Sequence, residues 1–322
     1  MIRQYANKVL AIVTGLILIG CHQAQTTAQE IASRHETTLQ WVTPIVSAPR
    51  LQHCIFYSAA AESEVSYHIY TPELYDTEGT RRFPVLFWLH GHGGGLNGIP
   101  YLVKSFDLAI RAGEMPPVLI VFPNGLFESM WCNSKDGRVP METIVVEELV
   151  PHIDSVFRTI ASPEARLIEG FSMGGYGAAR LGFRYHDIFG AVSTLGAGPL
   201  QREFYPSIGP SGMALSRERV LRDVYGSDQE YFRTQSPWVL AEQNAFALSS
   251  NSHLRIAIGD RDETLDFNRD FDSHLTNLGI PHTFEVLPDI GHNTMALFNA
   301  LGDSNWEFYR NVFGPEVPAD GL

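Results

Sequence analysis

Short apolar runs alternate with amphipathic stretches along most of this chain. The runs at 83–90 and 118–122 are nearly continuous, which is typical of strands buried on both faces of a parallel sheet. Further strands are predicted at 53–58, 65–70, 165–169, 191–195, 254–259 and 283–287, and helices at 142–158, 176–185, 267–278 and 294–313. This βα alternation predicts an α/β fold with an open, mostly parallel sheet and helices on both faces.

The periodicity degrades between residues 196 and 252, where four prolines interrupt short helical pieces. A segment inserted there would lie above the carboxyl ends of the strands, where binding loops gather in such folds. We therefore expect 196–252 to be a lid or an insertion that selects the substrate.

The predicted strand that begins at Ala165 runs directly into Gly170-Phe171-Ser172-Met173-Gly174, followed at once by a helical pattern. A Gly-x-Ser-x-Gly sequence between a strand and a helix is typical of a nucleophile elbow, a turn so tight that only small residues fit on either side of the serine. The alternative is a serine that caps a helix at a glycine-rich turn. The motif makes Ser172 the candidate nucleophile.

A serine nucleophile needs a histidine to take its proton and a carboxylate to orient that histidine. In this fold the chain order is serine, acid, histidine. His292 follows the last predicted strand in a loop, whereas His274 and His282 lie in a helix and a strand, so His292 is the candidate base. The turn after 254–259 offers Asp262 as the acid, with Asp260 next.

Two backbone amides are candidates for an oxyanion hole, which stabilises the charge on an attacked carbonyl. The Met173 amide lies at the start of the helix behind Ser172, and the His92 amide lies in the glycine-rich turn after 83–90. Trp131, in the loop after 118–122, either lines a substrate pocket or is a packed surface tryptophan. The adjacent Glu147 and Glu148 point away from each other on a helix and are interpreted as a solvated face.

The first residues indicate export. Met1–Lys8 carries two positive charges and is followed by an apolar run, which together form a secretory signal. Leu18-Ile19-Gly20-Cys21 resembles a bacterial lipobox, which implies a signal peptide over 1–20 and lipidation of Cys21. The protein would then be anchored to the cell envelope, at the outer membrane where the organism has one. The alternative is an ordinary cleaved signal. Residues 21–49 are expected to be a tether, and 50–316 the catalytic domain.

Composition and residue spacing disfavour several classes of partner and cofactor. The formal net charge is −13, which disfavours nucleic acid as a partner. No His/Cys/Asp cluster has metal-ligand spacing, and there is no phosphate loop or dinucleotide fingerprint, so no metal or cofactor is expected. Cys54 and Cys132 are predicted either to pair in an oxidising compartment or to be free buried thiols.

Taken together, these motifs resemble the α/β-hydrolase esterases of the Putative esterase family, which includes feruloyl esterases, S-formylglutathione hydrolases, enterochelin esterases and antigen 85 proteins. The resemblance covers about 65–306. It is carried by Phe-Pro-Val-Leu-Phe-Trp-Leu-His-Gly from residue 83, Phe-Pro-Asn-Gly from 122, Glu-Glu-Leu-Val-Pro-His-Ile-Asp from 147, Gly-Phe-Ser-Met-Gly-Gly from 170, and Gly291-His292. It implies the same nucleophile, acid, base and oxyanion amides. Several relatives have a tryptophan close behind the catalytic histidine, where this chain has Asn293-Thr294-Met295.

The leading hypothesis is a serine carboxylic ester hydrolase that acts on a small-molecule or carbohydrate ester, such as a feruloyl ester. One alternative is transfer of the acyl group to a sugar or lipid alcohol, as in antigen 85 proteins. Another is a surface lipoprotein that binds a ligand on a catalytically silent hydrolase fold. The sequence defines neither part of the ester, because function follows from the site and not from the fold.

Overall fold

The computed structural model describes residues 39–209, 213–251 and 253–314. The predicted signal peptide, Cys21 and most of the predicted tether lie outside the described residues. Among the described residues, no helix has both the length and the apolar character needed to cross a bilayer.

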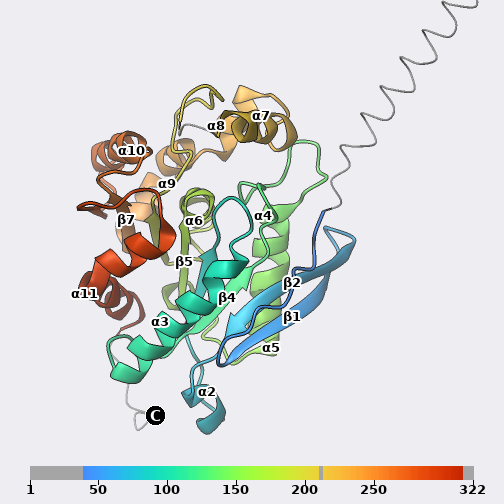
Figure 1. The fold of residues 1–322 in the computed structure, drawn as a ribbon, viewed down its shortest axis with the longest axis vertical. Helices are drawn as coiled ribbons and strands as arrows, with labels where there is room; N and C mark the ends of the chain where they lie inside the picture. The colour runs from blue at the N-terminus through green and yellow to red at the C-terminus, as the bar shows by residue number, and fades with distance from the viewer. Residues whose placement is uncertain (1–38, 210–212, 252, 315–322) are drawn as a thin grey trace, which may run out of the picture. The chain divides into compact units, whose positions relative to one another are not determined.

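A single eight-stranded sheet forms the centre of the described domain, with strand order β1-β2-β4-β3-β5-β6-β7-β8 (Figure 1). β1 and β2 form an antiparallel hairpin, β2 pairs antiparallel with β4, and every other neighbouring pair is parallel. The fold is therefore the predicted α/β-hydrolase type with a mostly parallel sheet. The strands are β1 (Leu51–Ser58), β2 (Ser63–Tyr70), β3 (Val85–Leu89), β4 (Leu119–Pro123), β5 (Arg166–Phe171), β6 (Ala191–Leu195), β7 (His253–Gly259) and β8 (Thr283–Leu287).

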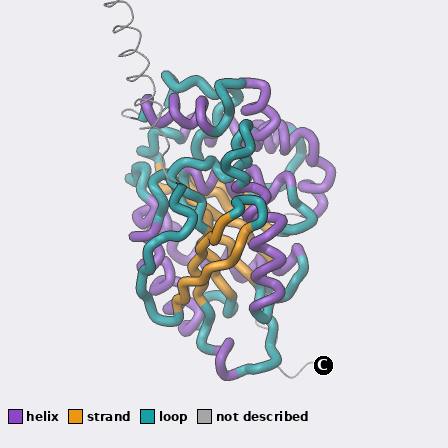
Figure 2. The backbone as a smooth tube through the Cα atoms, turned by 90° about the vertical axis from the view of Figure 1, so that its right-hand side faces the viewer, coloured by secondary structure: helices purple, strands orange, loops and turns teal. Residues whose placement is uncertain are grey.

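Helices cover both faces of the sheet (Figures 1 and 2). One apolar layer contains α3 (Ile99–Ala112) and α11 (Thr294–Phe313). The opposite layer contains α5 (Val150–Val156), α6 (Met173–Arg184), α9 (Pro237–Asn251) and α10 (Leu265–Asn277). Side chains alternate along β3, so that Val85 and Phe87 face the second layer while Leu86 and Trp88 face the first. Both faces are buried, which explains the continuous apolar runs in the sequence.

The predicted helix over 142–158 is composite. It consists of α4 (Met141–Thr143), a π-helical stretch η2 (Ile144–Leu149) and α5. Glu147 is exposed as expected, whereas Glu148 is partly buried and accepts hydrogen bonds from Ser58 Oγ and the Ala60 amide. The interpretation of both glutamates as a solvated face was therefore wrong for Glu148, because the β1–β2 turn folds over it. Short elements elsewhere are α2 (Leu74–Thr77), η1 (Leu96–Gly98) and η3 (Pro163–Ala165).

Helix α3 was absent from the elements predicted from the sequence. Ile99, Leu102, Val103 and Phe106 are buried at the three- and four-residue spacing of an amphipathic helix. Pro100 lies in the first turn, and Gly113 ends the helix with a φ of 72°, so a start signal and a stop signal were both present in the sequence.

The catalytic domain begins before residue 50. Trp41 is buried, and its carbonyl accepts hydrogen bonds from the Ser66 amide (3.0 Å) and Asn124 Nδ2 (2.8 Å). The Thr43 amide donates to Ser66 Oγ at 2.8 Å. The prediction of a tether through residue 49 was therefore wrong at its end, because residues from 41 onward bond to the domain.

The segment 196–252 contributes α7 (Ala214–Asp223), α8 (Gln229–Gln235) and α9, the first two at the top of Figure 1. α7 bonds to the loops that follow β3 and β4, since Ser216 contacts both His92 and Glu128. The segment therefore contacts the carboxyl end of the sheet. Cys54 and Cys132 are both free thiols, as the second alternative has it, but only Cys132 is buried and Cys54 is partly buried.

Candidate active site

Ser172 occupies a strained turn between β5 and α6. Its backbone has φ 57° and ψ −119°, outside the regions that side-chain-bearing residues ordinarily adopt. The turn is possible because its neighbours are glycines. A Cβ on Gly174 would lie 1.9 Å from the Leu89 carbonyl oxygen, and one on Gly170 would lie 2.4 Å from the Gly174 carbonyl. The predicted elbow is thus present, and α6 begins at Met173, three residues earlier than the helical pattern indicated.

Three side chains from distant parts of the chain form a continuous hydrogen-bonded series. Ser172 Oγ lies 2.9 Å from His292 Nε2, and His292 Nδ1 lies 2.7 Å from Asp262 Oδ2. The turn after β7 carries Asp262, and the loop between β8 and α11 carries His292, as the sequence predicted. Both ring nitrogens of the histidine are therefore engaged, one by the serine and one by the carboxylate.

The environment of Asp262 favours its ionised form. The residue is only 5% exposed, and its second oxygen, Oδ1, accepts hydrogen bonds from the amide and hydroxyl of Thr264, each at 2.8 Å. Burial alone would raise the pKa of Asp262, but the hydrogen bond and charge of His292 and the bonds from Thr264 lower it below its usual value. The other candidate acid, Asp260, is exposed. The structure thus places Asp262, and not Asp260, against His292.

One predicted oxyanion residue, Met173, follows Ser172 directly, and the other, His92, belongs to a turn that passes beside Ser172. Met173 is the first residue of α6, where helix amides have no partner within the helix. The turn after β3 passes beside the serine, because a Cβ on Gly91 would lie 3.3 Å from Ser172 Cβ. His92 follows Gly91, so its amide belongs to the same turn.

His90 stabilises the start of that turn. Its Nδ1 lies 2.7 Å from the Gly91 carbonyl oxygen and must carry the proton, and its Nε2 accepts from the Gly125 amide at 3.0 Å. Burial lowers the pKa of His90 to about 4, so the ring stays neutral at physiological pH. A neutral His90 can accept and donate at once, which ties the turn after β3 to the loop after β4.

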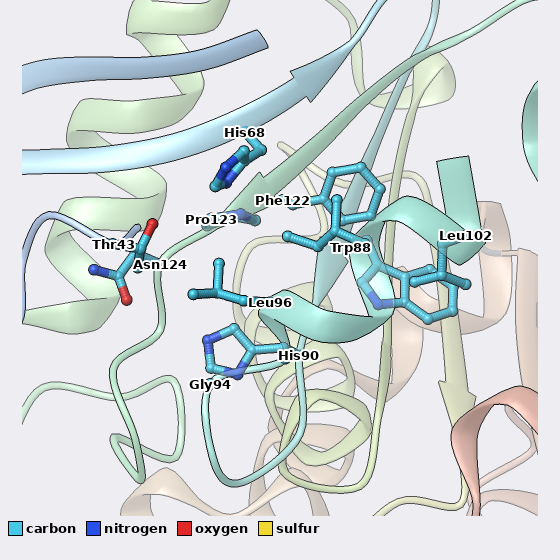
Figure 3. Close-up of a pocket in the computed structure, with 12 residues that line it drawn as sticks. Thr43, His68, Trp88, His90, Gly94, Leu96, Leu102, Phe122, Pro123 and Asn124 are labelled. Atoms are coloured by element: carbon cyan, nitrogen blue, oxygen red, sulfur yellow. The ribbon is translucent and has the colours of Figure 1, made fainter. Parts of the chain in front are cut away.

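His90 also lines a pocket (Figure 3). It is lined by residues at the ends of β3 and β4 and by the first turn of α3, among them Trp88, Leu96 and Phe122. None of the candidate catalytic residues lines it. We therefore place the chemistry at Ser172 and not in this pocket.

Trp131 is fully buried and does not line an open pocket. Its indole N–H donates to the His90 carbonyl at 3.1 Å, and the ring fills the space above two glycines, Gly125 and Gly177. The prediction of a substrate contact is therefore not supported, and the alternative of a packed surface tryptophan was right about the packing but wrong about the surface, because the ring is fully buried. The loop places this side chain inward because both glycines leave room for a large ring.

Sequence reasoning missed a polar cluster beside the turn that carries His92. Glu128, in the loop after β4, receives hydrogen bonds from His92, Ser216 and Arg219. Phe127, next to it, is 56% exposed and its ring lies 4.6 Å from the His92 ring. No sequence spacing links these residues, because they come from three separate segments.

A buried charged network lies beneath the elbow. Glu169, three residues before Ser172, pairs with Arg255 of β7 at 2.9 Å and accepts from the Tyr309 hydroxyl at 2.8 Å. Arg255 also donates to Ser193 Oγ and to Asn305 Oδ1. The network therefore connects β5, β6, β7 and α11 directly below the candidate nucleophile.

A family model described as "Putative esterase" matches residues 58–313. An esterase of Mycobacterium tuberculosis is 34% identical over 164 residues, which is 48% of this chain and 34% of that protein. An endo-1,4-beta-xylanase/feruloyl esterase of Xylanibacter ruminicola is 29% identical over 161 residues, which is 48% of this chain and 22% of that protein. The aligned region thus spans about a third of the first relative's length and less of the second's.

Solved structures match a larger share of this chain than the sequence relatives do. A ferulic acid esterase covers 82% of this chain and 98% of its own, with a TM-score of 0.68 at 24% identity. An S-formylglutathione hydrolase from Agrobacterium tumefaciens covers 82% of this chain and 95% of its own, with a TM-score of 0.65 at 18% identity. At these identities the likeness establishes the fold alone.

Proposed function

Because the chain belongs to the Putative esterase family, we propose that it is a carboxylic ester hydrolase that cleaves esters through an acyl-enzyme on Ser172. In this proposal His292 is the general base and Asp262 is its carboxylate partner. The observation that carries it is the unbroken series of hydrogen bonds from Ser172 Oγ through both nitrogens of His292 to Asp262. A catalytically silent hydrolase fold would have no need to keep these three side chains within hydrogen-bond distance of one another.

The geometry supports the following steps. Ser172 Oγ attacks the ester carbonyl while its proton moves to His292 Nε2, and the imidazolium is stabilised by Asp262. The carbonyl oxygen becomes an oxyanion that accepts from the amides of Met173 and His92. The tetrahedral species collapses as the alcohol leaves with the proton from Nε2. Water, deprotonated by the same nitrogen, then releases the acid from Ser172.

The proposed substrates are carbohydrate esters or other esters of the feruloyl type. One relative is named a feruloyl esterase, and structural neighbours are solved with ferulic acid and with sinapinate bound. We further propose that the protein is exported and anchored through a lipid on Cys21, which rests on the signal and lipobox pattern of residues 1–21. An esterase anchored in this way would encounter carbohydrate esters outside the cell.

The test is hydrolysis of short p-nitrophenyl esters and methyl ferulate by a chain that lacks residues 1–21. Ser172→Ala should lower kcat/KM by about a thousandfold or more. The matched control is Ser273→Ala, because Ser273 is an exposed serine on α10 whose hydroxyl bonds only locally to the Arg269 carbonyl. An organophosphonate should label the wild type and the control but not Ser172→Ala. Equal activity in all three proteins would overturn the proposal.

A further inference from the structure

Glu128 joins three segments at one carboxylate. Oε2 lies 3.1 Å from His92 Nε2 and accepts from Ser216 Oγ at 2.9 Å, while Oε1 accepts from Arg219 Nε at 2.9 Å. Arg219 Nη2 also reaches Oε2 at 3.3 Å. His92 belongs to the turn after β3, Glu128 to the loop after β4, and the other two residues to α7 (Figure 1). The carboxylate therefore connects the 196–252 segment to the turn that carries a proposed oxyanion amide.

The cluster determines where the His92 proton lies. An ionised carboxylate only accepts, and the single hydroxyl proton of Ser216 is donated to Glu128. Ser216 Oγ also lies 2.7 Å from His92 Nε2, so Nε2 must carry a proton to satisfy both neighbours. Burial would raise the pKa of Glu128, but hydrogen bonds from His92, Arg219 and Ser216 lower it to about 2. The carboxylate is thus ionised throughout the neutral range.

The turn at His92 has few other means of staying in place. Gly93, Gly94 and Gly95 all have positive φ, and a Cβ on either of the first two would meet nothing within 4 Å. These glycines have no side chain to pack, and glycine has the largest conformational freedom in the unfolded chain. The Gly93 amide donates to the carbonyl of Phe127, the residue before Glu128, at 2.9 Å. Apart from the bonds at His90, the loop after β4 therefore holds this turn through the Gly93 backbone bond, the Phe127 ring against His92 and the Glu128 side chain.

We propose that Glu128 is a positioning residue that acts through the His92 side chain and makes the oxyanion hole depend on the seating of α7. When Arg219 and Ser216 engage Glu128, the carboxylate holds the imidazole of His92 and so fixes the plane of its peptide. When α7 lifts, Glu128 loses the partners on that helix and its hold on His92 weakens. The inference rests on the proposed function, because it assigns the His92 amide to the oxyanion.

The catalytic test is a double-mutant cycle between Glu128→Gln and His92→Ala. Both kcat and KM are measured with a p-nitrophenyl ester over concentrations that reach saturation. Loss of one oxyanion donor lowers kcat by about a hundredfold to a thousandfold, and a loosened donor should cost less, about tenfold or more. We expect Glu128→Gln to lower kcat with KM changed less than about threefold. In the His92→Ala background the same substitution should have no further effect, because the two residues act as one unit. An undiminished effect in that background would overturn the proposal.

A second measurement does not depend on catalysis. Hydrogen exchange should become faster at the amides of 92–95 in Glu128→Gln and in Arg219→Met, and Arg219→Lys should restore part of the protection. Arg222→Ala is the matched control, since Arg222 lies on the same helix and bonds to its neighbour Asp223. It should leave both the exchange at 92–95 and kcat unchanged.

These outcomes separate the two proposals. Faster exchange at 92–95 in the Glu128 and Arg219 variants, together with a fall in kcat, supports the positioning role. Unchanged exchange overturns it, even if Ser172→Ala is inactive. If Ser172→Ala retained wild-type activity, the proposed function would fail and the catalytic role of Glu128 with it.

Discussion

Asp262 holds His292 at 2.7 Å while its other oxygen is occupied by two hydrogen bonds from Thr264. The carboxylate therefore cannot rotate to satisfy another partner without losing one of these bonds. This fixes the imidazole plane, so that Nε2 faces Ser172 Oγ at 2.9 Å. The alignment of the candidate base is thus set by an acid in the turn after β7, whereas the candidate nucleophile follows β5.

Asp262→Asn should lower kcat by about ten-thousandfold while the fold is retained, because an amide can donate to Nδ1 and so favours the wrong histidine tautomer. The control is Asp260→Asn, which changes an exposed acid in the same turn and should leave kcat unchanged. Steady-state kinetics with one p-nitrophenyl ester would decide between them. A larger loss in the Asp260 variant would reverse the assignment of the acid.

Gly174→Ala should prevent formation of the elbow. A Cβ at this position would lie 1.9 Å from the Leu89 carbonyl oxygen, and backbone at the end of a buried strand cannot move aside cheaply. We expect little folded protein, or a strongly lowered melting temperature with no activity. Gly79→Ala, where a Cβ meets nothing within 4 Å, should melt like the wild type. A stable, active Gly174 variant would show that the turn tolerates side chains.

Acid should weaken the Glu128 cluster. The pKa of Glu128 is lowered from 4.5 to about 2 in the folded protein, since the bonds from His92, Arg219 and Ser216 outweigh the effect of burial. A lowered pKa contributes stability above pH 4.5 that is lost as the pH falls toward 2. The difference in free energy of unfolding between wild type and Glu128→Gln should therefore shrink across this range. Urea unfolding at pH 6 and pH 3 tests this, and a constant difference would contradict it.

The fold and the candidate catalytic residues were largely predictable from the sequence, for local reasons. The central strands β3, β4, β5 and β6 are buried on both faces and consist mostly of apolar residues, and the elbow around Ser172 requires glycines at fixed spacing. Asp262 and His292 each follow a strand, so chain order alone placed them at the same edge of the sheet.

What the sequence concealed depends on contacts between distant segments. The burial of Trp131 follows from space left by Gly177 on α6, and the packing of Trp41 depends on β2 and Asn124. Glu128 and Ser216 are separated by 88 residues, and neither lies in a recognisable motif. Helix α3 is a different case, because its amphipathic pattern and its terminal Pro100 and Gly113 are local features of the sequence.

Arg255→Met should destabilise the domain by about 3 to 5 kcal/mol, because it leaves the carboxylate of Glu169 buried without its charged partner. Burial raises the pKa of Glu169 in spite of Arg255, so the remaining carboxyl would take up a proton and recover part of this loss. The double variant Glu169→Gln/Arg255→Met should be more stable than Arg255→Met alone, since no buried charge is then unpaired. Urea unfolding of the three proteins at neutral pH measures the differences. If Arg255→Met lost less than about 1 kcal/mol, the network would not be what holds β5 and β7 together beneath Ser172.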